Sequence, residues 1–345
     1  MIRNILLFIA IAVVAISCSN SSKNTAPIRK ELPMANIIAD SLFTQFPGTL
    51  QVTSNHILLQ TPFDKDGFLK IYDRKTGKEI DWIGKIGRGP GEWSTPSFGN
   101  VINDKLVVFD LNERKYVLAD MENLYQDISN PSSIKKIDVE ANRLNLTNNN
   151  QIIVADFIDE TYPFKMLTKD KPIPFGKYPF NEKITNAIER LQGHVLIHPK
   201  KNLMLYGTID NPYLSLYSIN DNSTKLLWEN QFEDPDYTIT NGVLSWGKNK
   251  SSGIFDICFT KDYIVCLIAD TKSIKKKAQM SARGTTMEVP FYSIYLFDYQ
   301  GSLSHIFDLQ VCAIRLAGNI QSNVIYLVAI PDFSIITYDL SDYGL

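Results

Sequence analysis

Two neighbouring stretches of the chain, residues 84–96 (GKIGRGPGEWSTP) and residues 105–120 (KLVVFDLNERKYVLAD), decide the fold. The second stretch holds two short runs of apolar, β-branched and aromatic residues with a polar turn between them, which is the pattern of two antiparallel strands. The first stretch is rich in glycine and proline, which end regular structure and allow sharp turns. Together they predict a strand hairpin that the chain reaches through a tight crossing.

The same strand pattern recurs six times along the chain. Each unit spans about 45–60 residues, close to the length of a propeller blade, and the units begin near Thr49, Ser97, Asn142, Gly193, Gly253 and Val311. Each unit has three strands, and a fourth follows in most of them after a turn rich in Gly, Asn or Asp, residues that tolerate positive φ. This fourth strand is least clear in units two and three. The sequence therefore predicts an all-β fold, a six-bladed β-propeller with four-stranded antiparallel blades.

The sixth unit lacks a fourth strand, because the chain ends shortly after residues 335–340 (IITYDL). Residues 36–46 (NIIADSLFTQF) precede the first unit and have no other partner. An unpaired strand edge is a liability that ring closure removes. We therefore predict that residues 36–46 lie antiparallel to the third strand of unit six and close the ring.

The glycine-rich crossing and the hairpin after it also carry a resemblance to a known repeat. The matching residues are Gly91, Glu92, Trp93, Pro96, Asp110, Asn112 and Arg114. This pattern resembles the NHL-type propeller repeat, and the whole chain resembles the six-bladed β-propeller lipoproteins of Gram-negative bacteria, related to NHL and TolB-like propellers. The resemblance implies the fold and says little about function, because one fold hosts many functions.

The N-terminus is typical of an exported lipoprotein. Arg3 precedes an apolar run at residues 5–16, too short to span a bilayer and fitting a signal peptide over residues 1–17. The string AISC resembles a lipobox, which implies lipid attachment at Cys18; the alternative is an ordinary signal peptide cut nearby. Residues 18–35 are expected to form the lipidated start and a flexible tether, and residues 36–345 the propeller. We expect anchoring in the outer membrane facing the periplasm, with the cell surface as an alternative.

Charge and cysteine content exclude some classes of function. The chain has 35 basic and 37 acidic residues, so it lacks the basic excess of a general nucleic-acid binder. Cys258 and Cys266 fall on two strands of one hairpin, so a disulfide is conceivable, but buried thiols in apolar strands are the favoured interpretation. No CxxC spacing suggests a metal cage.

The glycines of the crossing allow two interpretations. They do not fit a P-loop, which needs GxxxxGK[ST], nor a dinucleotide loop, because strands rather than a helix follow. The first interpretation is a sharp connection between blades whose backbone requires glycine. The second places Arg88, Glu92 and Trp93 at the mouth of the channel as ligand contacts.

No catalytic residue, metal site or cofactor emerges from the sequence. His194 and His198 lie four residues apart on a predicted strand, about 13 Å from one another, too far to share one ion. Asp256 and Asn145 could belong to a calcium site of the lactonase type, but no ordered series accompanies them. No GxSxG nucleophile motif is present.

We therefore expect a membrane-anchored binding or scaffold propeller for a protein, peptide or glycan. The alternative is a metal-dependent lactonase- or lyase-type enzyme that uses the central channel. A basic stretch at residues 272–286 has two interpretations. It is either a solvated hairpin tip, or a docking element for an acidic partner or for lipid head groups.

Overall fold

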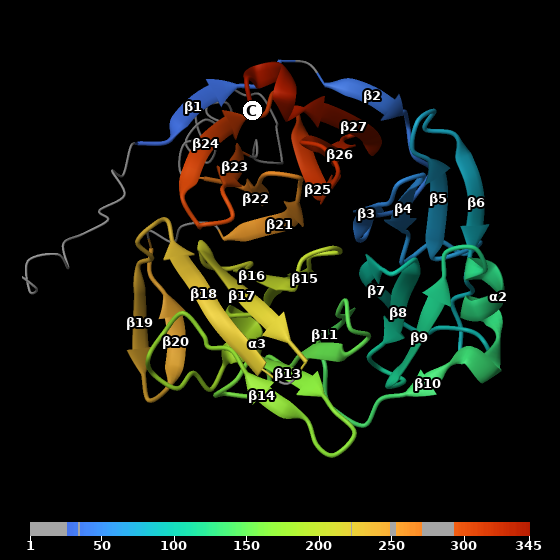
Figure 1. Ribbon diagram of the computed structural model, residues 1–345, viewed down its shortest axis with the longest axis horizontal. Coiled ribbons are helices and arrows are strands. Elements are labelled where there is room, and N and C mark those ends of the chain that lie inside the picture. The colour runs from blue at the N-terminus through green and yellow to red at the C-terminus, as the bar shows by residue number, and fades with distance from the viewer. Residues whose placement is uncertain (1–25, 34, 222, 249–252, 271–292) are drawn as a thin grey trace, which may run out of the picture.

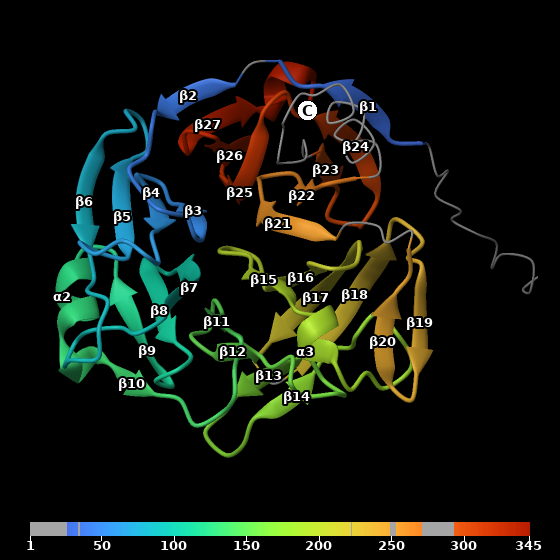
Figure 2. The ribbon, with the colours of Figure 1, turned by 180° about the vertical axis from the view of Figure 1, so that it is seen from behind.

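The computed structural model describes residues 26–33, 35–221, 223–248, 253–270 and 293–345. Six antiparallel blades stand around a central axis, and the chain passes from blade to blade in sequence order (Figure 1 and Figure 2). The predicted six-bladed β-propeller is confirmed. The predicted signal peptide, Cys18 and the basic stretch 272–286 all lie outside the described residues.

The first three blades each run from an inner strand at the axis to an outer strand at the rim. Blade one has β3 (Leu50–Val52), β4 (His56–Gln60), β5 (Leu69–Asp73) and β6 (Glu79–Ile83). Blade two has β7 (Pro96–Ile102), β8 (Lys105–Asp110), β9 (Lys115–Asp120) and β10 (Lys135–Lys136). Blade three has β11 (Arg143–Leu146), β12 (Ile152–Ala155), β13 (Phe164–Leu167) and β14 (Ile173–Phe175).

The other three blades follow the same order. Blade four has β15 (Gly193–Ile197), β16 (Leu203–Thr208), β17 (Tyr213–Asn220) and β18 (Ser223–Gln231). Blade five has β21 (Ile254–Phe259), β22 (Ile264–Ile268), β23 (Ser293–Phe297) and β24 (Leu303–Asp308). Blade six has β25 (Cys312–Gly318), β26 (Val324–Ile330), β27 (Ser334–Asp339) and β2 (Asn36–Ala39).

Short elements decorate the rim and the loops. They are the helices α2 (Leu124–Ser129) and α3 (Ala187–Arg190), the 3-10 turns η2 (Pro131–Ser133) and η3 (Leu340–Tyr343), and the hairpin of β19 (Tyr237–Thr240) and β20 (Val243–Trp246). None of the helices in the described residues is long and apolar enough to cross a membrane.

Burial explains why the middle strands are apolar and the outer strands alternate. All five residues of β22 are buried, because both faces of this strand pack against neighbouring blades. Along β18, exposed residues alternate with half-buried ones, as expected for a rim strand with one wet face. Apolar clusters fill the space between blades; Leu58 and Phe68 of blade one, for example, pack with Leu106 and Val108 of blade two.

Ring closure occurs at the predicted place. β2 pairs antiparallel with β27, with Asn36 opposite Thr337 and Ile37 opposite Ile336. The strand ends at Ala39, so it is shorter than the predicted segment 36–46. The N-terminal strand therefore supplies the fourth strand that blade six lacks.

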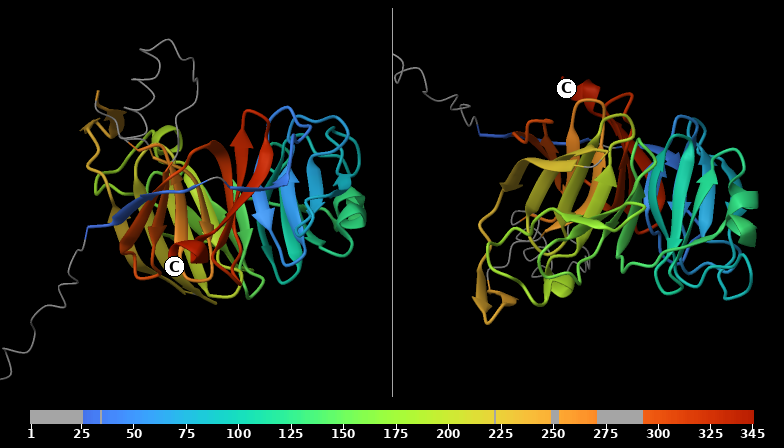
Figure 3. Two further views of the ribbon diagram at one scale, coloured as in Figure 1. Left: turned by 90° about the horizontal axis from the view of Figure 1, so that it is seen from above. Right: turned by 60° about the horizontal axis from the view of Figure 1, so that its bottom comes forward.

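The predicted tether over residues 18–35 is too long. Ile28–Glu31 form β1, which pairs in parallel with β24 as a fifth strand of blade five. The Arg29 guanidinium holds this strand in place, because it binds the carboxylates of Asp270 at 2.8 Å and Asp308 at 2.5 Å. Figure 3 shows the N-terminal segment running across the outer side of blades five and six.

The cysteines behave as small buried side chains. Cys258 and Cys266 are buried free thiols, and the β21–β22 register pairs Cys258 with Val265 rather than with Cys266. Burial raises the pKa of the Cys266 thiol, so this thiol stays uncharged. The buried-thiol interpretation is confirmed, and the cross-strand disulfide is wrong.

Candidate functional site

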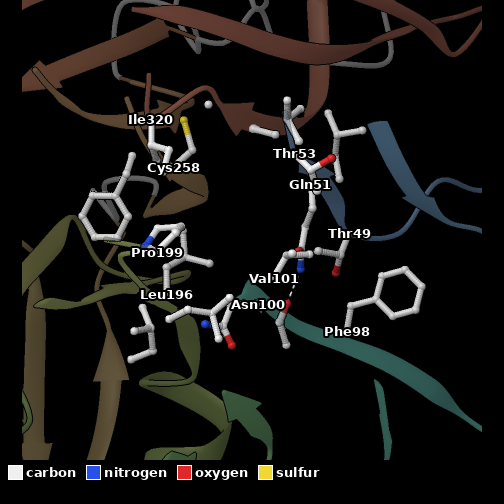
Figure 4. A pocket seen from close by; sticks show the side chains of 18 of the residues that line it. Thr49, Gln51, Thr53, Phe98, Asn100, Val101, Leu196, Pro199, Cys258 and Ile320 are labelled. Atoms are coloured by element: carbon white, nitrogen blue, oxygen red, sulfur yellow. Dashed lines mark hydrogen bonds between the residues drawn. The ribbon is translucent and has the colours of Figure 1, made fainter. Parts of the chain in front are cut away.

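The inner strands enclose a cavity of about 1130 Å³ on the axis of the ring. All six inner strands contribute to its wall. Figure 4 shows Gln51 and Asn100 side by side on one part of the wall, with Leu196, Pro199 and Cys258 across the open space. The volume lies slightly above the range of about 300–1,000 Å³ that is typical of small-ligand sites.

Several polar side chains on this wall tie one blade to the next. The Gln51 amide of blade one donates to the Gly99 carbonyl of blade two. Asn100 of blade two donates to the Leu146 carbonyl at 2.7 Å and accepts from the Leu146 N–H at 2.8 Å. In blade three the Asn145 amide donates to the Val195 carbonyl at 3.2 Å.

The same kind of link continues through blades five and six. The Asp256 carboxylate of blade five accepts from the Leu316 N–H of blade six at 2.9 Å. The Arg315 Nε of blade six donates to the Gly48 carbonyl, just before blade one, at 2.5 Å. Asn145 and Asp256, which the sequence offered as calcium-ligand candidates, both belong to this set of links, which holds the wall of the cavity rigid.

Four ionisable side chains meet where the inner strands begin. They are Arg143 on β11, His194 on β15, Asp256 on β21 and Arg315 on β25, which we call the channel cluster. Each comes from a different one of four consecutive blades. His194 Nδ1 lies 3.6 Å from Asp256 Oδ1, and these two side chains are 23% and 15% exposed.

The channel cluster carries a net positive charge at neutral pH. Burial raises the pKa of Asp256 to about 6, and Arg315 and Arg143 oppose this shift only in part, so the carboxylate is mostly ionised at pH 7. Burial and the two guanidinium groups lower the pKa of His194 to about 3, so the imidazole is neutral. Two positive charges therefore face one negative charge.

The two arginines differ in how they are held. Arg315 donates to the carbonyls of Gly48 and Ile314 and lies 5.4 Å from the ring centre of Phe46 and 5.9 Å from that of Phe255. Arg143 makes one hydrogen bond within the described residues, to the adjacent Asn142 carbonyl at 2.9 Å. Arg315 is thus held in place by the protein, whereas Arg143, which also lines the cavity, makes only the one hydrogen bond to a protein group among the described residues.

The predicted channel-mouth contacts lie elsewhere. Arg88, Glu92 and Trp93 are absent from the described cavity wall. Trp93 is fully buried, packs against Phe68, and donates its indole N–H to the Ile128 carbonyl at 3.0 Å. None of the three side chains lies on the cavity wall, and a role of Arg88 and Glu92 in ligand contact stays a prediction.

The crossing has the form expected of a tight connection between blades. Gly91 has a φ of +76°, and a Cβ at this position would lie 2.1 Å from the Ser129 carbonyl oxygen. The Glu92 carboxylate accepts the Gly89 N–H at 2.8 Å, inside the loop itself. Glycine is thus required here by the backbone path.

The two histidines have separate surroundings. His198 lies in the turn after β15, and its Nδ1 accepts the N–H groups of Lys200 at 3.0 Å and Lys201 at 2.9 Å. His194 lies in β15 and belongs to the channel cluster, where its Nδ1 faces the Asp256 carboxylate. Within the described residues, no group of three or more His, Cys, Asp or Glu side chains is arranged to hold a metal ion.

Sequence reasoning considered His194 as a metal ligand and rejected it, considered Asp256 only as a calcium-ligand candidate, and missed Arg143 and Arg315. The sequence signal for these residues is their position, because each member of the channel cluster lies in the inner strand of its own unit. An ionisable residue in each of four consecutive inner strands, in an otherwise apolar pattern, would have pointed to the axis.

Comparison with known proteins supports the fold. No curated protein matches the chain. Among solved structures, a protein of Bacteroides fragilis NCTC 9343 named as exported has a TM-score of 0.53 at 11% identity, over 88% of each chain. A member of the DUF4221 family from Bacteroides vulgatus ATCC 8482 has a TM-score of 0.54 at 10% identity, over 88% of this chain and 93% of that one.

The family assignment covers most of the chain. Residues 28–312 match the family described as TolB-like 6-blade propeller-like. The match begins at β1 and ends at the start of β25, so it spans five complete blades and the N-terminal strands. With the six blades observed, this chain belongs to the TolB-like six-bladed propeller family.

Proposed function

We propose that the protein is an exported lipoprotein whose propeller is a binding module, taking part of a protein, peptide or glycan ligand into its central cavity. The observation that carries this proposal is the cavity of about 1130 Å³ with the channel cluster on its wall. Links between all but one pair of neighbouring inner strands hold this wall rigid, and rigid walls reduce the entropy that binding costs.

The enzymatic alternative, a lactonase or lyase reaction in the channel, would need a general base of suitable pKa. His194 is a weak base because its pKa is lowered to about 3. Asp256 is already engaged by the N–H groups of Ile257 and Leu316. A binding function uses these side chains as they stand, so it is the one we propose.

Filling the cavity tests this proposal. Leu196→Trp on β15 adds a large side chain to the cavity wall, and Leu227→Trp on the rim strand β18 of the same blade is the matched control, because Leu227 is 45% exposed. Binding of both variants and the wild type to glycan and peptide arrays is compared. We expect Leu196→Trp to lose the wild-type signals and Leu227→Trp to keep them; equal binding by all three proteins would contradict a cavity site.

Membrane attachment is proposed separately, through Cys18 to the outer membrane on its periplasmic side. Cys18→Ala should release the protein from the membrane fraction with an unchanged melting temperature, because the first described strand, β1, begins at Ile28, beyond this residue. Fractionation with a Ser19→Ala control measures it. Full membrane retention of Cys18→Ala would contradict the lipid anchor.

A further inference from the structure

We infer that the cavity recognises a carboxylate group that carries hydroxyl neighbours, as in an acidic saccharide, with Arg143 binding the carboxylate and His194 accepting a hydroxyl. The inference rests on the proposed function, since it assigns a ligand class to the same cavity. Its basis is two groups of the channel cluster: the Arg143 guanidinium, which makes one hydrogen bond to a protein group among the described residues, and the His194 Nε2 atom, which makes none there.

Arg143 is the first of these groups. Its side chain is half-buried at the start of β11, and within the described residues no carboxylate lies within 4 Å of it. A guanidinium has five N–H donors in a planar fork that matches a carboxylate, and Arg143 uses its donors once within the protein. Burial lowers the pKa of Arg143, because desolvation disfavours the charged form of the guanidinium. A bound anion would supply the missing partner.

The remaining charges favour an anion over a cation. Asp256 is the only carboxylate of the channel cluster, and it already accepts N–H groups from Ile257 and Leu316 at 2.9 Å. Arg315 adds a second positive charge, fixed by its bond to the Gly48 carbonyl. An anion placed beside Arg143 therefore meets a positive field even with Asp256 ionised.

His194 supplies the polar specificity. Its Nδ1 lies 3.6 Å from the Asp256 Oδ1 acceptor, so we assign the single proton of the neutral imidazole to Nδ1. Its Nε2 is buried and has no hydrogen-bond partner among the described residues. An unprotonated Nε2 is an acceptor, so the ligand group that suits it is a donor such as a hydroxyl.

Acid should tighten binding of such a ligand. Protonation of Asp256, with a pKa of about 6, removes the one negative charge of the channel cluster. The charged groups facing it are Arg143 and Arg315, which keep their charge, and His194 stays neutral down to a pH of about 3. The neighbouring thiols of Cys258 and Cys266 have raised pKa values and stay uncharged. Lowering the pH from 7 to 5 should therefore raise the affinity about fivefold.

Calorimetry with trigalacturonate, maltotriose and N-acetyl-dialanine tests the inference. Trigalacturonate carries both carboxylates and hydroxyls. Maltotriose carries hydroxyls without a carboxylate, and N-acetyl-dialanine carries a carboxylate without hydroxyls. We expect trigalacturonate to bind at least tenfold more tightly than the other two. Tighter binding of N-acetyl-dialanine would assign the carboxylate to a peptide and overturn the saccharide. Equal binding of maltotriose, or no acid bound at about 10 mM, would overturn the inference.

Variants separate this inference from the proposed function. Arg143→Gln should weaken trigalacturonate binding about tenfold or more and Arg143→Lys less, because lysine keeps the charge without the fork. Arg114→Gln is the control, because Arg114 is 58% exposed and outside the cavity wall. If ligands bind and Leu196→Trp abolishes binding while Arg143→Gln does not change it, the cavity function stands and the carboxylate assignment fails. If Leu196→Trp also leaves binding unchanged, both fail.

Discussion

Two regions of the molecule differ in how visible they are in the sequence. One is the crossing between blades one and two, and the other is the channel cluster. The crossing, residues 84–96, stands out in the sequence, and its residues hold the protein together: Trp93 is buried and Gly91 allows a close approach to Ser129. The channel cluster is inconspicuous in the sequence, because its members lie a blade apart along the chain. Yet these members converge on one cavity.

The difference follows from the geometry of a ring. Residues adjacent in sequence share a blade or a loop, so a local motif reports how neighbouring blades are joined. Residues at the axis come from strands that are distant in sequence, so a site there has no local signature. In this propeller the dense motif therefore indicates structure, and the scattered ionisable residues of the inner strands mark the ligand site that we propose.

The largest effect that separates the two regions is expected for Trp93→Ala. This change should lower the free energy of unfolding by about 3–5 kcal/mol, because it leaves a cavity in a closely packed core. Urea unfolding measures it, with Trp82→Ala as the control, because Trp82 is only half-buried. Trigalacturonate affinity, measured below the melting transition, should be unchanged. A stable variant that had lost binding would make the crossing part of the ligand site.

A second, smaller loss of stability is expected for Asp110→Asn. Asp110 belongs to the hairpin that follows the crossing. Asp110 is 1% exposed and accepts from the Ser94 N–H at 2.6 Å and the Thr95 N–H at 3.0 Å. Burial alone would raise its pKa, but hydrogen bonds from Thr95, Glu113 and Ser94 lower it overall. We expect Asp110→Asn to lose about 2 kcal/mol of stability at pH 7.

The pH dependence checks the cause of this loss. A carboxylate whose pKa is lowered by folding stabilises the protein above the unfolded-state pKa near 4, and the contribution disappears as the pH falls through the folded-state value. The stability gap between wild type and Asp110→Asn should therefore narrow below pH 4. A gap that stayed constant in acid would show that packing, not charge, causes the loss.

The sequence predicted the ring well and the site poorly, and physical reasons account for both. Strand periodicity, turn residues and the missing strand of unit six are local signals, so the blades and the β2–β27 closure could be predicted. The β19–β20 hairpin carried the signal Asn241–Gly242, both with positive φ, but lay between units and was missed. β1 could not be predicted, because its short polar sequence is fixed by Arg29 binding to distant carboxylates.

A third, smaller effect concerns His198, which shares a hairpin with the cavity residue His194. Burial and nearby Lys201 lower the pKa of His198 to about 4. A histidine with a lowered folded-state pKa stabilises the protein above its unfolded value near 6.5, and this stability is lost as the pH falls from there towards 4. His198→Asn, whose Oδ1 can accept the same two N–H groups, should cost about 1 kcal/mol at pH 7.5.

Ligand affinity, measured together with the stability curve in acid, distinguishes the two histidines. His198→Asn should flatten the loss of stability between pH 6.5 and 4.5 without changing ligand affinity, because His198 serves a turn. His194→Gln should also flatten it, and it should weaken trigalacturonate binding as well. Equal effects of the two changes on affinity would contradict the separation of turn and site.

The smallest effect is expected for Arg88→Ala with Glu92→Ala, in the middle of the crossing. Arg88 is exposed, and Glu92 is half-buried with its carboxylate on the Gly89 N–H. Gly87 and Gly89 leave room for this carboxylate, since a Cβ on either would come within 3 Å of it. Losing the one hydrogen bond should cost about 0.5–1 kcal/mol, a shift of a few degrees in melting temperature. Glu92→Gln, which keeps an acceptor oxygen, should lose less.

Ligand affinity of the same double variant decides whether the crossing has any binding role. Neither side chain lies on the cavity wall, so we expect trigalacturonate affinity within about twofold of wild type. Arg143→Gln, measured alongside, provides the scale of a true contact. If the double variant instead lost affinity as strongly as Arg143→Gln while keeping its fold, the ligand would have to extend over the rim between blades one and two. The prominent motif would then serve both structure and recognition.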